Sequence, residues 1–177
     1  TTEIYTLSLH DALPIWWCKK MAIRIVREKG DPVLREHTAN VKRFDETLAR
    51  LVDDMFETMY HYNGVGLAAP QIAIPKRIVV LDAGDGERYT LINPKIVLAE
   101  GSQVDVEGCL SVPGVYGEVE RCSQIRVQAQ DVTGELFEIE ATEFLARVLQ
   151  HELDHLHGVL FVDKVIRYIP KEELADE

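Results

Sequence analysis

The chain has 177 residues, of which 46% are hydrophobic and 28% charged, with 11 glycines and 7 prolines. These values are typical of one globular domain and exclude disordered, collagen-like and membrane-spanning chains. The 19 basic and 30 acidic residues give a net charge of −11, so the phosphate backbone of a nucleic acid is expected to be repelled.

The first 20 residues differ from the rest of the chain. They lack a basic start, and His10 and Asp11 interrupt the apolar stretch that a secretory signal requires. Met21 opens a segment with the alternation and the Gly-Asp-Pro turn of an ordinary domain start. We therefore expect residues 1–20 to be a non-native leader and residues 21–177 to form a single domain. The alternative is that residues 1–20 form a real strand or arm that packs on that domain.

Residues 45–62 have the pattern of an amphipathic helix. Apolar side chains recur at steps of three and four, and this stripe includes Met55 and Met59. Asp45 is placed to cap the start of the helix, and Asn63-Gly64 is placed to end it. The methionines are expected to fill the core and not to bind a ligand.

The region from residue 77 to about residue 141 consists of short β-branched runs, at residues 77–82, 89–94, 95–100, 102–107, 124–131 and 136–141. Residues 131–134, Asp-Val-Thr-Gly, predict a hairpin turn between the last two runs, and Asn93-Pro94 and Pro113-Gly114 are expected to break others. A helix, then many strands, then a helix indicates an α+β fold with mixed or antiparallel strands, and not alternating βαβ units.

The three cysteines, Cys18, Cys109 and Cys122, are an odd number without a short-loop disulfide framework. This usage favours free thiols in a reducing compartment, so we expect a cytoplasmic protein. We interpret Cys122 as a buried hydrophobic residue. No apolar run approaches the roughly 20 residues of a spanning helix, so no membrane anchor is expected.

Residues 142–157 predict a second helix, with Thr142 as N-cap and Gly158 at the C-terminal stop. On a helical wheel that starts at Phe144, the other apolar side chains cover about half of the circle, and the remaining half is mostly polar. The apolar half is expected to face the core and consists of Val148, Leu145, Leu156, Leu149 and Leu153. The other half is expected to face the solvent and consists of Ala146, His157, Gln150, Asp154 and Arg147.

Three ionisable residues fall on the apolar half of this wheel. His151 and His155 lie within about 20° of Phe144, and Glu152 lies near the middle of the apolar arc. Buried, unpaired polar groups cost roughly 1–3 kcal/mol each, so these three groups must be compensated.

A divalent metal ion compensates them directly, because two imidazoles at i and i+4 can bind one ion. The sequence His-Glu-Leu-Asp-His has this His-Glu-x-x-His spacing. Glu152 is then close enough to a metal-bound water to act as a general base without binding the ion. The alternative is two core histidines bonded to backbone carbonyls beside a glutamate in a buried ion pair. His157 lies on the polar half and is expected to be solvated.

Two histidines leave such a metal ion short of one protein ligand. Downstream of His155 the candidates Asp163, Glu172 and Glu173 fall in an expected tail. Upstream, Cys109 follows a glycine, and a thiolate in a reducing compartment is a good ligand. Taken alone, a cysteine such as Cys109 is more often a buried hydrophobic residue than a metal ligand.

Three segments together resemble the motifs of bacterial peptide deformylases, in their order and approximate spacing: Gly-Val-Gly-Leu-Ala-Ala-Pro-Gln at 64–71, Glu-Gly-Cys-Leu-Ser at 107–111 and Gln-His-Glu-Leu-Asp-His at 150–155. The resemblance runs from about Met21 to Lys164. It implies an α+β catalytic domain with strands around a central helix that carries the His-Glu-x-x-His motif.

The resemblance also implies roles for individual residues. Cys109, His151 and His155 would be the metal ligands, and Glu152 the catalytic acid and base. Gln71 and the backbone N–H of Leu110 would stabilise the oxyanion.

A substrate-binding region is expected beside these motifs. Gly64 and Gly66 would allow an extended peptide to approach the backbone. Val65, Phe144 and Val148 would line an apolar pocket for a methionine side chain, with a plain core role as the alternative. Glu107 and Arg121 are predicted to pair behind Cys109.

The implied activity is removal of the formyl group from the N-terminal methionine of nascent chains. The donor set alone favours zinc, whereas the resemblance implies Fe²⁺, with Zn²⁺ or Ni²⁺ in purified protein. The expected partners are a formyl-methionyl peptide and, transiently, the ribosome. The chain ends Lys-Glu-Glu-Leu-Ala-Asp-Glu and lacks the basic helix of family members with ribosome-docking tails.

Two other functions compete with this hypothesis. An His-Glu-x-x-His protease would require a third ligand downstream of the motif. A metal- or peptide-binding module without turnover would keep the same residues.

Overall fold

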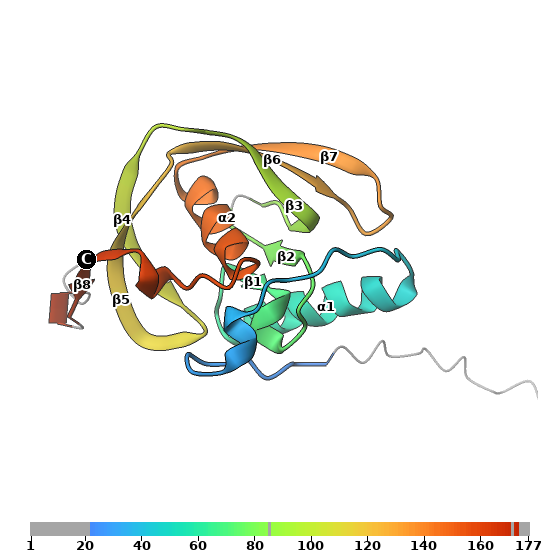
Figure 1. The fold of residues 1–177 in the computed structure, drawn as a ribbon, viewed down its shortest axis with the longest axis horizontal. Helices are drawn as coiled ribbons and strands as arrows, with labels where there is room; N and C mark the ends of the chain where they lie inside the picture. The colour runs from blue at the N-terminus through green and yellow to red at the C-terminus, as the bar shows by residue number, and fades with distance from the viewer. Residues whose placement is uncertain (1–21, 85, 171, 174–177) are drawn as a thin grey trace, which may run out of the picture.

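The computed structural model describes residues 22–84, 86–170 and 172–173. The prediction for residues 1–20 lies outside these residues. The elements follow one another as η1 (Pro32–Arg35), α1 (Glu46–His61), β1 (Gly66–Ala68), η2 (Ala69–Ile72), β2 (Ile78–Leu81), β3 (Tyr89–Glu100), β4 (Gln103–Cys109), β5 (Val112–Arg121), β6 (Gln124–Gln130), β7 (Leu136–Thr142), α2 (Glu143–His155), η3 (Phe161–Asp163) and β8 (Val165–Ile169) (Figure 1). Every ladder between these strands is antiparallel, which confirms the α+β class.

Helix α1 follows its sequence pattern closely. The side chain of Asp45 accepts hydrogen bonds from the backbone N–H groups of Thr47 and Leu48, which caps the first turn. Met55 and Met59 are fully buried, so they fill the core as predicted. Asn63 has a φ of 55° and ends the helix in the left-handed conformation that asparagine tolerates.

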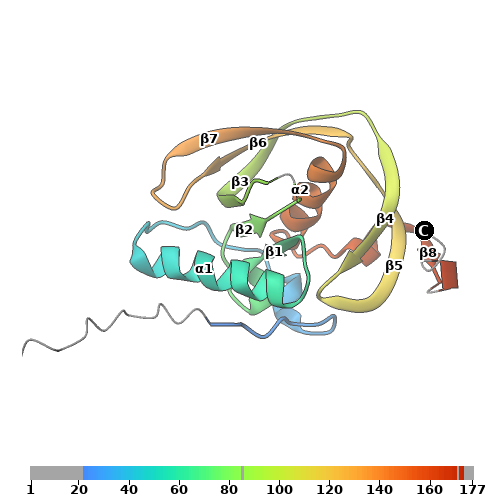
Figure 2. The same ribbon diagram turned by 180° about the vertical axis from the view of Figure 1, so that it is seen from behind.

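A five-stranded sheet in the order β1-β2-β3-β6-β7 separates the two helices. Strand β2 is buried along its whole length because both of its faces are covered. Ile78 and Val80 belong to the apolar cluster beneath α1, whereas Val79 and Leu81 belong to the cluster that includes α2. Alternate side chains therefore enter two different cores, as the period of a strand requires. Figure 2 shows β2 running between α1 and α2.

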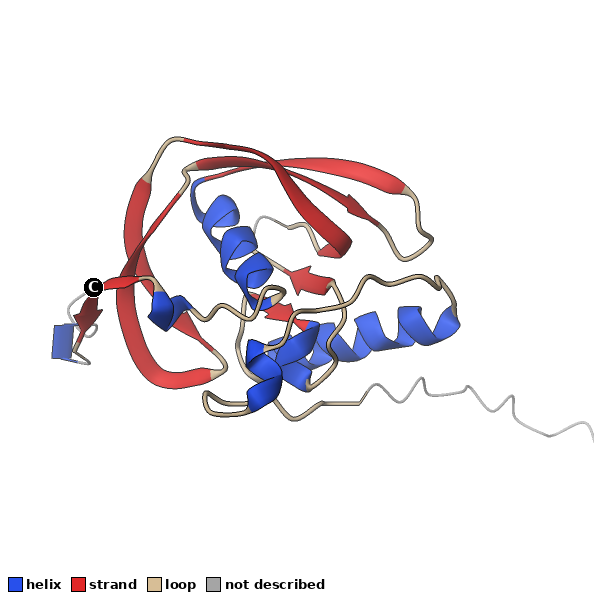
Figure 3. Ribbon diagram, viewed as in Figure 1, coloured by secondary structure: helices blue, strands red, loops and turns tan. Residues whose placement is uncertain are grey.

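The second sheet has three strands in the order β4-β5-β8 and stands beside α2 (Figure 3). Val119 of β5 packs with Leu34 and Phe161 in a third, smaller cluster. Helix α2 contacts both sheets, because it packs against β1, β2, β6 and β7 of the five-stranded sheet while Arg147 donates to the carbonyl of Val119 in β5. The end of β4 is thereby held next to the last turns of α2.

Two expected strand breaks are wrong. Strand β3 continues through Asn93-Pro94. The register against β6 shifts between Ile92 and Lys95, so the proline, which has no N–H, lies at an irregularity of the ladder. The side chain of Asn93 also bonds Val41 and Gln130, which holds the irregular backbone in place. Strand β5 likewise includes Pro113-Gly114, and the tight turn between β4 and β5 lies earlier, at residues 110–111. The Asp131–Gly134 hairpin turn is confirmed.

Helix α2 departs from the wheel in two places. Thr142 stands at the N-cap position, but its side chain makes no capping hydrogen bond. Arg147 and Ala146, which were expected on the solvent half, are buried, and Phe144, which was expected in the core, is 49% exposed. Arg147 is buried because β4 and β5 form a second layer on its side of α2, where it contacts Glu107 and the carbonyl of Val119. Ala146 instead packs in the cluster between α2 and the five-stranded sheet. Neither α1 nor α2 is long and apolar enough to cross a membrane.

Candidate metal centre

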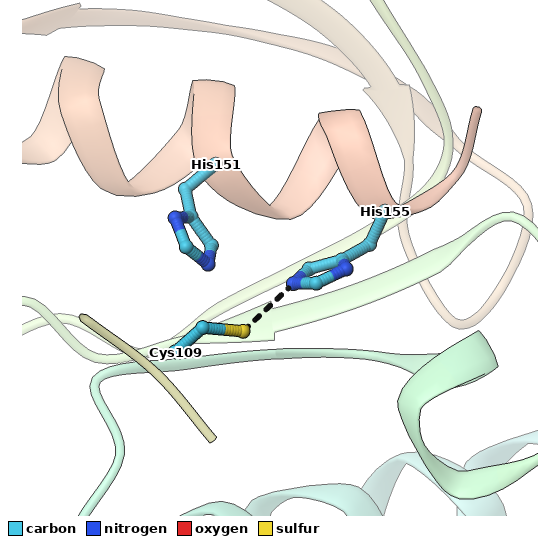
Figure 4. A group of neighbouring side chains, drawn as sticks. All are labelled: Cys109, His151 and His155. Carbon is cyan, nitrogen blue, oxygen red and sulfur yellow. Dashed lines mark hydrogen bonds between the residues drawn. The ribbon is translucent and has the colours of Figure 1, made fainter. Parts of the chain in front are cut away.

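Three potential metal ligands meet where the end of β4 faces the last turns of α2. Cys109 is the final residue of β4, and His151 and His155 lie one turn apart on the same side of α2 (Figure 4). Their donor atoms all lie within 4.8 Å of one another, and Cys109 Sγ is 3.3 Å from His155 Nε2. Within the described residues this is the only such group of three, and Asp163 instead pairs with Arg35.

The surroundings of the two histidines suit a cation. Burial lowers the pKa of His155 well below its usual value, which keeps its imidazole in the neutral form that binds metals. Burial also lowers the pKa of His151, but hydrogen bonds to Cys109 and Glu107 outweigh this effect and raise it to about 10. The position between these groups therefore favours positive charge. One sulfur and two imidazoles within reach of one point are a donor set that fits a divalent transition metal.

Glu107 forms the centre of a buried charge cluster behind this group. Its carboxylate contacts Arg121 Nε and Nη2 at 2.9 Å each, Arg147 Nη1 at 2.8 Å and His151 Nδ1 at 2.9 Å. Burial opposes ionisation of Glu107, but the bonds to Arg121 and His151 hold its pKa well below the usual range. The predicted pairing with Arg121 is present, and the carboxylate of Glu107 also contacts the ring of His151.

Replacing Glu107 by Gln is expected to lower metal affinity by about 10- to 100-fold, because the carboxylate that fixes the ring of His151 and neutralises two arginines is lost. Competition with a chromophoric chelator measures this affinity. Glu118→Gln is the matched control, since Glu118 pairs with Arg167 on the surface of the same sheet. Equal affinity in Glu107→Gln and wild type would show that Glu107 has no part in holding the ligand.

Glu152 lies next to the ligand group with its carboxylate held out of water. Its side chain is buried, and Oε2 has no hydrogen-bond partner among the described residues. Burial raises its pKa to about 7, and the neighbouring His151 only partly opposes this shift. A carboxylate in such a place can exchange a proton near neutral pH.

Gly66 of β1 leaves the space that Glu152 occupies. A Cβ at residue 66 would lie 2.5 Å from Glu152 Oε1 and 2.8 Å from its Cγ, closer than real contacts allow. Gly66 is therefore required for close approach, and its backbone forms one wall of the site.

The variant Gly66→Ala is expected to lower the turnover (kcat) of any reaction in which Glu152 transfers a proton by about 10- to 100-fold, because the methyl group displaces the Glu152 carboxylate by about an ångström. The double variant Gly66→Ala/Glu152→Ala tests this cause. Once Glu152 is removed, the added methyl should change kcat by less than about twofold. If the double variant instead shows the sum of the two single losses in log kcat, the effect of the methyl group does not act through Glu152.

Gln71 is oriented by its own surroundings. Its Oε1 accepts a hydrogen bond from the N–H of Ala68 at 2.8 Å, so its Nε2 points toward Cys109 Sγ at 3.7 Å and Ser111 Oγ at 3.1 Å. The amide group is buried, and one donor is thus aimed at the ligand group. Leu110 follows Cys109 directly in the turn between β4 and β5.

A cavity of about 570 Å³ opens over this group. The predicted catalytic, substrate-binding and metal-binding residues line it, with the exception of His155, and they include Gly64, Leu110 and Val148. Phe144 and Val65 are 49% and 44% exposed at its wall, so a plain core role is wrong for these two side chains, while Val148 is buried. The cavity therefore presents apolar surface to a ligand.

Two residues of the site were missed from the sequence. Arg147 is buried against Glu107, and its guanidinium also donates to the carbonyl of Gln103. Ser111 is fully buried and holds the amide of Gln71. The position of Ser111 inside the Glu-Gly-Cys-Leu-Ser motif was a usable indication, whereas only the second sheet explains the burial of Arg147.

Comparisons with known proteins agree with this geometry. A family model described as polypeptide deformylase matches residues 23–170. The chain belongs to the peptide deformylase family. A peptide deformylase of Acetivibrio thermocellus is 54% identical over 154 residues, which are 87% of this chain and 90% of the relative. One from Caldicellulosiruptor bescii is also 54% identical, over 87% of this chain and 92% of the relative.

Solved peptide deformylase structures have the same fold. The crystal structure from Thermotoga maritima superposes with a TM-score of 0.80 at 46% identity, over 81% of this chain and 98% of the other. A structure from Acinetobacter baumannii with Met-Ala-Ser bound has a TM-score of 0.78 at 34% identity, over 82% of this chain and 99% of the other. Peptide deformylases are metal-dependent hydrolases, and the Cys-His-His group supplies the donors that such an enzyme needs.

Proposed function

We propose that this chain removes the formyl group from the N-terminal formyl-methionine of nascent polypeptides and releases formate. The observation that carries the proposal is the meeting of Cys109, His151 and His155 beside the buried carboxylate of Glu152, where Cys109, His151 and Glu152 line one cavity. Helix α2 acts as the central helix that carries the His-Glu-x-x-His motif, and family membership supports the reaction.

Cys109, His151 and His155 would hold the metal ion, which is Fe²⁺ in the cell and is replaceable by Zn²⁺ or Ni²⁺ in purified protein. A divalent ion there supplies Lewis acidity and lowers the pKa of a bound water molecule. A bound ion would hold Cys109 as the thiolate and both imidazoles in the neutral form, because only these forms bind metal. Glu107 contacts the ring of His151 at Nδ1 and would keep it in place.

The protein's own groups then move the proton and stabilise charge. Glu152 takes the proton of the attacking water and passes it to the leaving amine, which becomes the free N-terminus. Gln71 Nε2 and the N–H of Leu110 donate hydrogen bonds to the oxygen of the tetrahedral intermediate, which carries negative charge. The bond from Ala68 to Gln71 Oε1 fixes the donor in advance, so no reorganisation is needed during the reaction.

The substrate methionine would lie against the exposed ring of Phe144, with Val65 and Val148 on the same cavity wall. Gly64 and Gly66 allow the peptide backbone to run close to β1 as an added strand. The Met-Ala-Ser bound to the relative from Acinetobacter baumannii supports a peptide that begins with methionine.

The same proposal includes the setting of the reaction. We place the enzyme in the cytoplasm, with residues 21–177 as one catalytic domain to which residues 1–20 do not contribute. The match of the family model to residues 23–170 supports this division. The proposal also includes a transient contact with the ribosome, because nascent chains are the substrate.

Formate release from formyl-Met-Ala-Ser by anaerobically purified, Fe²⁺-loaded protein tests the function. We expect turnover by the wild type and none above background by Cys109→Ala. Peptide fragments cut at internal bonds would favour a protease, and bound metal without formate would favour a silent binding module.

A further inference from the structure

A second cavity, of about 400 Å³, lies on a different face of α2 from the metal centre. The residues around it come from the position just before β2, the middle of β3, the end of β5, the end of α2 with the turn that follows, and the segment before β8. Four of them are cationic and one is anionic: Arg77, Lys95, Arg121 and Lys164 against Asp154. The cavity is therefore net positive in a chain whose net charge is −11.

The single carboxylate of this cavity is already engaged. Asp154 Oδ2 lies 2.5 Å from Arg121 Nη1 and 2.6 Å from Lys164 Nζ. Arg121 is further held by Glu107 on the side of the metal centre. Asp154, Arg121 and Lys164 thus satisfy one another, and none of their charge is left to neutralise Arg77 or Lys95.

Arg77 is half-buried and has no carboxylate partner among the described residues. Its Nη2 donates to the carbonyl of Pro94 at 2.6 Å, and its Nη1 lies 3.3 Å from His157 Nε2. His157 Nδ1 bonds the carbonyl of Leu153 at 2.9 Å, which directs Nε2 toward Arg77 as an acceptor. Burial lowers the pKa of Arg77, because its positive charge is partly out of water without a counter-charge.

Lys95 stands at the same cavity as an exposed cation, and no ion pair of Lys95 is present in the part of the chain that is described. The two neutral contacts of Arg77 leave further N–H donors of the guanidinium free. A fixed guanidinium fork beside a mobile ammonium group is an arrangement that recognises phosphate.

We propose that this cavity binds the phosphate group of a small phosphate monoester, with Arg77 and Lys95 as its direct contacts. The volume is within the range of small-molecule sites and exceeds the need of a phosphate ion alone. A small ligand fits better than a nucleic acid, because the net charge of −11 repels a long phosphate backbone.

Isothermal titration of the Fe²⁺-loaded enzyme with glycerol 3-phosphate and with inorganic phosphate, at low ionic strength, tests the proposal. We expect saturable binding of glycerol 3-phosphate, and about tenfold weaker binding in Arg77→Gln and in Lys95→Gln. Lys76→Gln is the matched control, because Lys76 is exposed and adjacent in sequence but does not line the cavity. Its affinity should stay within about twofold of the wild type.

Formate release by the variants shows whether they are correctly folded, and neither Arg77 nor Lys95 belongs to the hydrolytic site. Lys95 is exposed, so Lys95→Gln keeps the test valid if Arg77→Gln fails to fold. If inorganic phosphate binds as tightly as glycerol 3-phosphate, the cavity recognises the free phosphate ion and not a phosphate monoester. If the ester binds at the metal centre instead, its affinity will be unchanged in both variants, and the proposal is wrong. The proposal is also wrong if binding does not saturate below about 10 mM ester, or if Lys76→Gln weakens binding as much as the other two substitutions.

Discussion

Glu152→Gln is expected to lower kcat for deformylation by about 10²- to 10⁴-fold while the metal content stays unchanged. Gln keeps the size of the side chain and its fit against Gly66, but its amide cannot accept and return the proton of the attacking water. Glu152 Oε2 has no hydrogen-bond partner among the described residues, so the substitution breaks no hydrogen bond at that oxygen. The loss therefore reports the proton transfer and not a change of structure.

Formate release at saturating formyl-Met-Ala-Ser measures kcat, and elemental analysis of the same sample measures the metal. Glu143→Gln is the matched control, because Glu143 lies on the same helix but is exposed in its first turn. It should keep kcat within about twofold. A Glu152→Gln enzyme with full metal and less than a tenfold loss would exclude Glu152 as the proton carrier.

Local patterns were enough to predict the helices and the hairpin. The stripe of residues 45–62 specifies α1 because one side of that helix faces a single core and the other faces water. The same argument failed for Arg147, since α2 has strands on two sides and a wheel allows for only one buried face. Continuation of β3 through Asn93-Pro94 also depended on distant partners, namely Val41 and Gln130.

The residues of the site also fall into those that local sequence patterns predicted and those that depend on contacts distant in sequence. Spacing alone placed His151 and His155 on one side of a helix, because i and i+4 residues are neighbours in any helix. Nothing local joined Cys109 to them, since that contact depends on how β4 packs against α2, and only the three motifs taken together indicated it. The role of Glu107 toward His151 required the side-chain geometry itself.

Gln71→Ala is expected to lower kcat by about 10²- to 10³-fold and to change KM little, because the amide donates to an oxygen that becomes charged only in the transition state. The geometry makes this separation possible. Gln71 is buried under the cavity, with Oε1 bound to Ala68 and Nε2 near Cys109, so it offers the substrate a single donor and little contact surface. Truncation removes that donor, and the backbone N–H of Leu110 remains as the other.

Steady-state formate release over a range of formyl-Met-Ala-Ser concentrations separates kcat from KM, and chelator competition checks that Cys109 still binds the metal. Gln128→Ala, an exposed change on β6, is the control and should leave both constants unchanged. A higher KM at constant kcat would mean that Gln71 binds the ground state of the peptide. The N–H of Leu110 would then be the remaining donor of this chain to the charged oxygen.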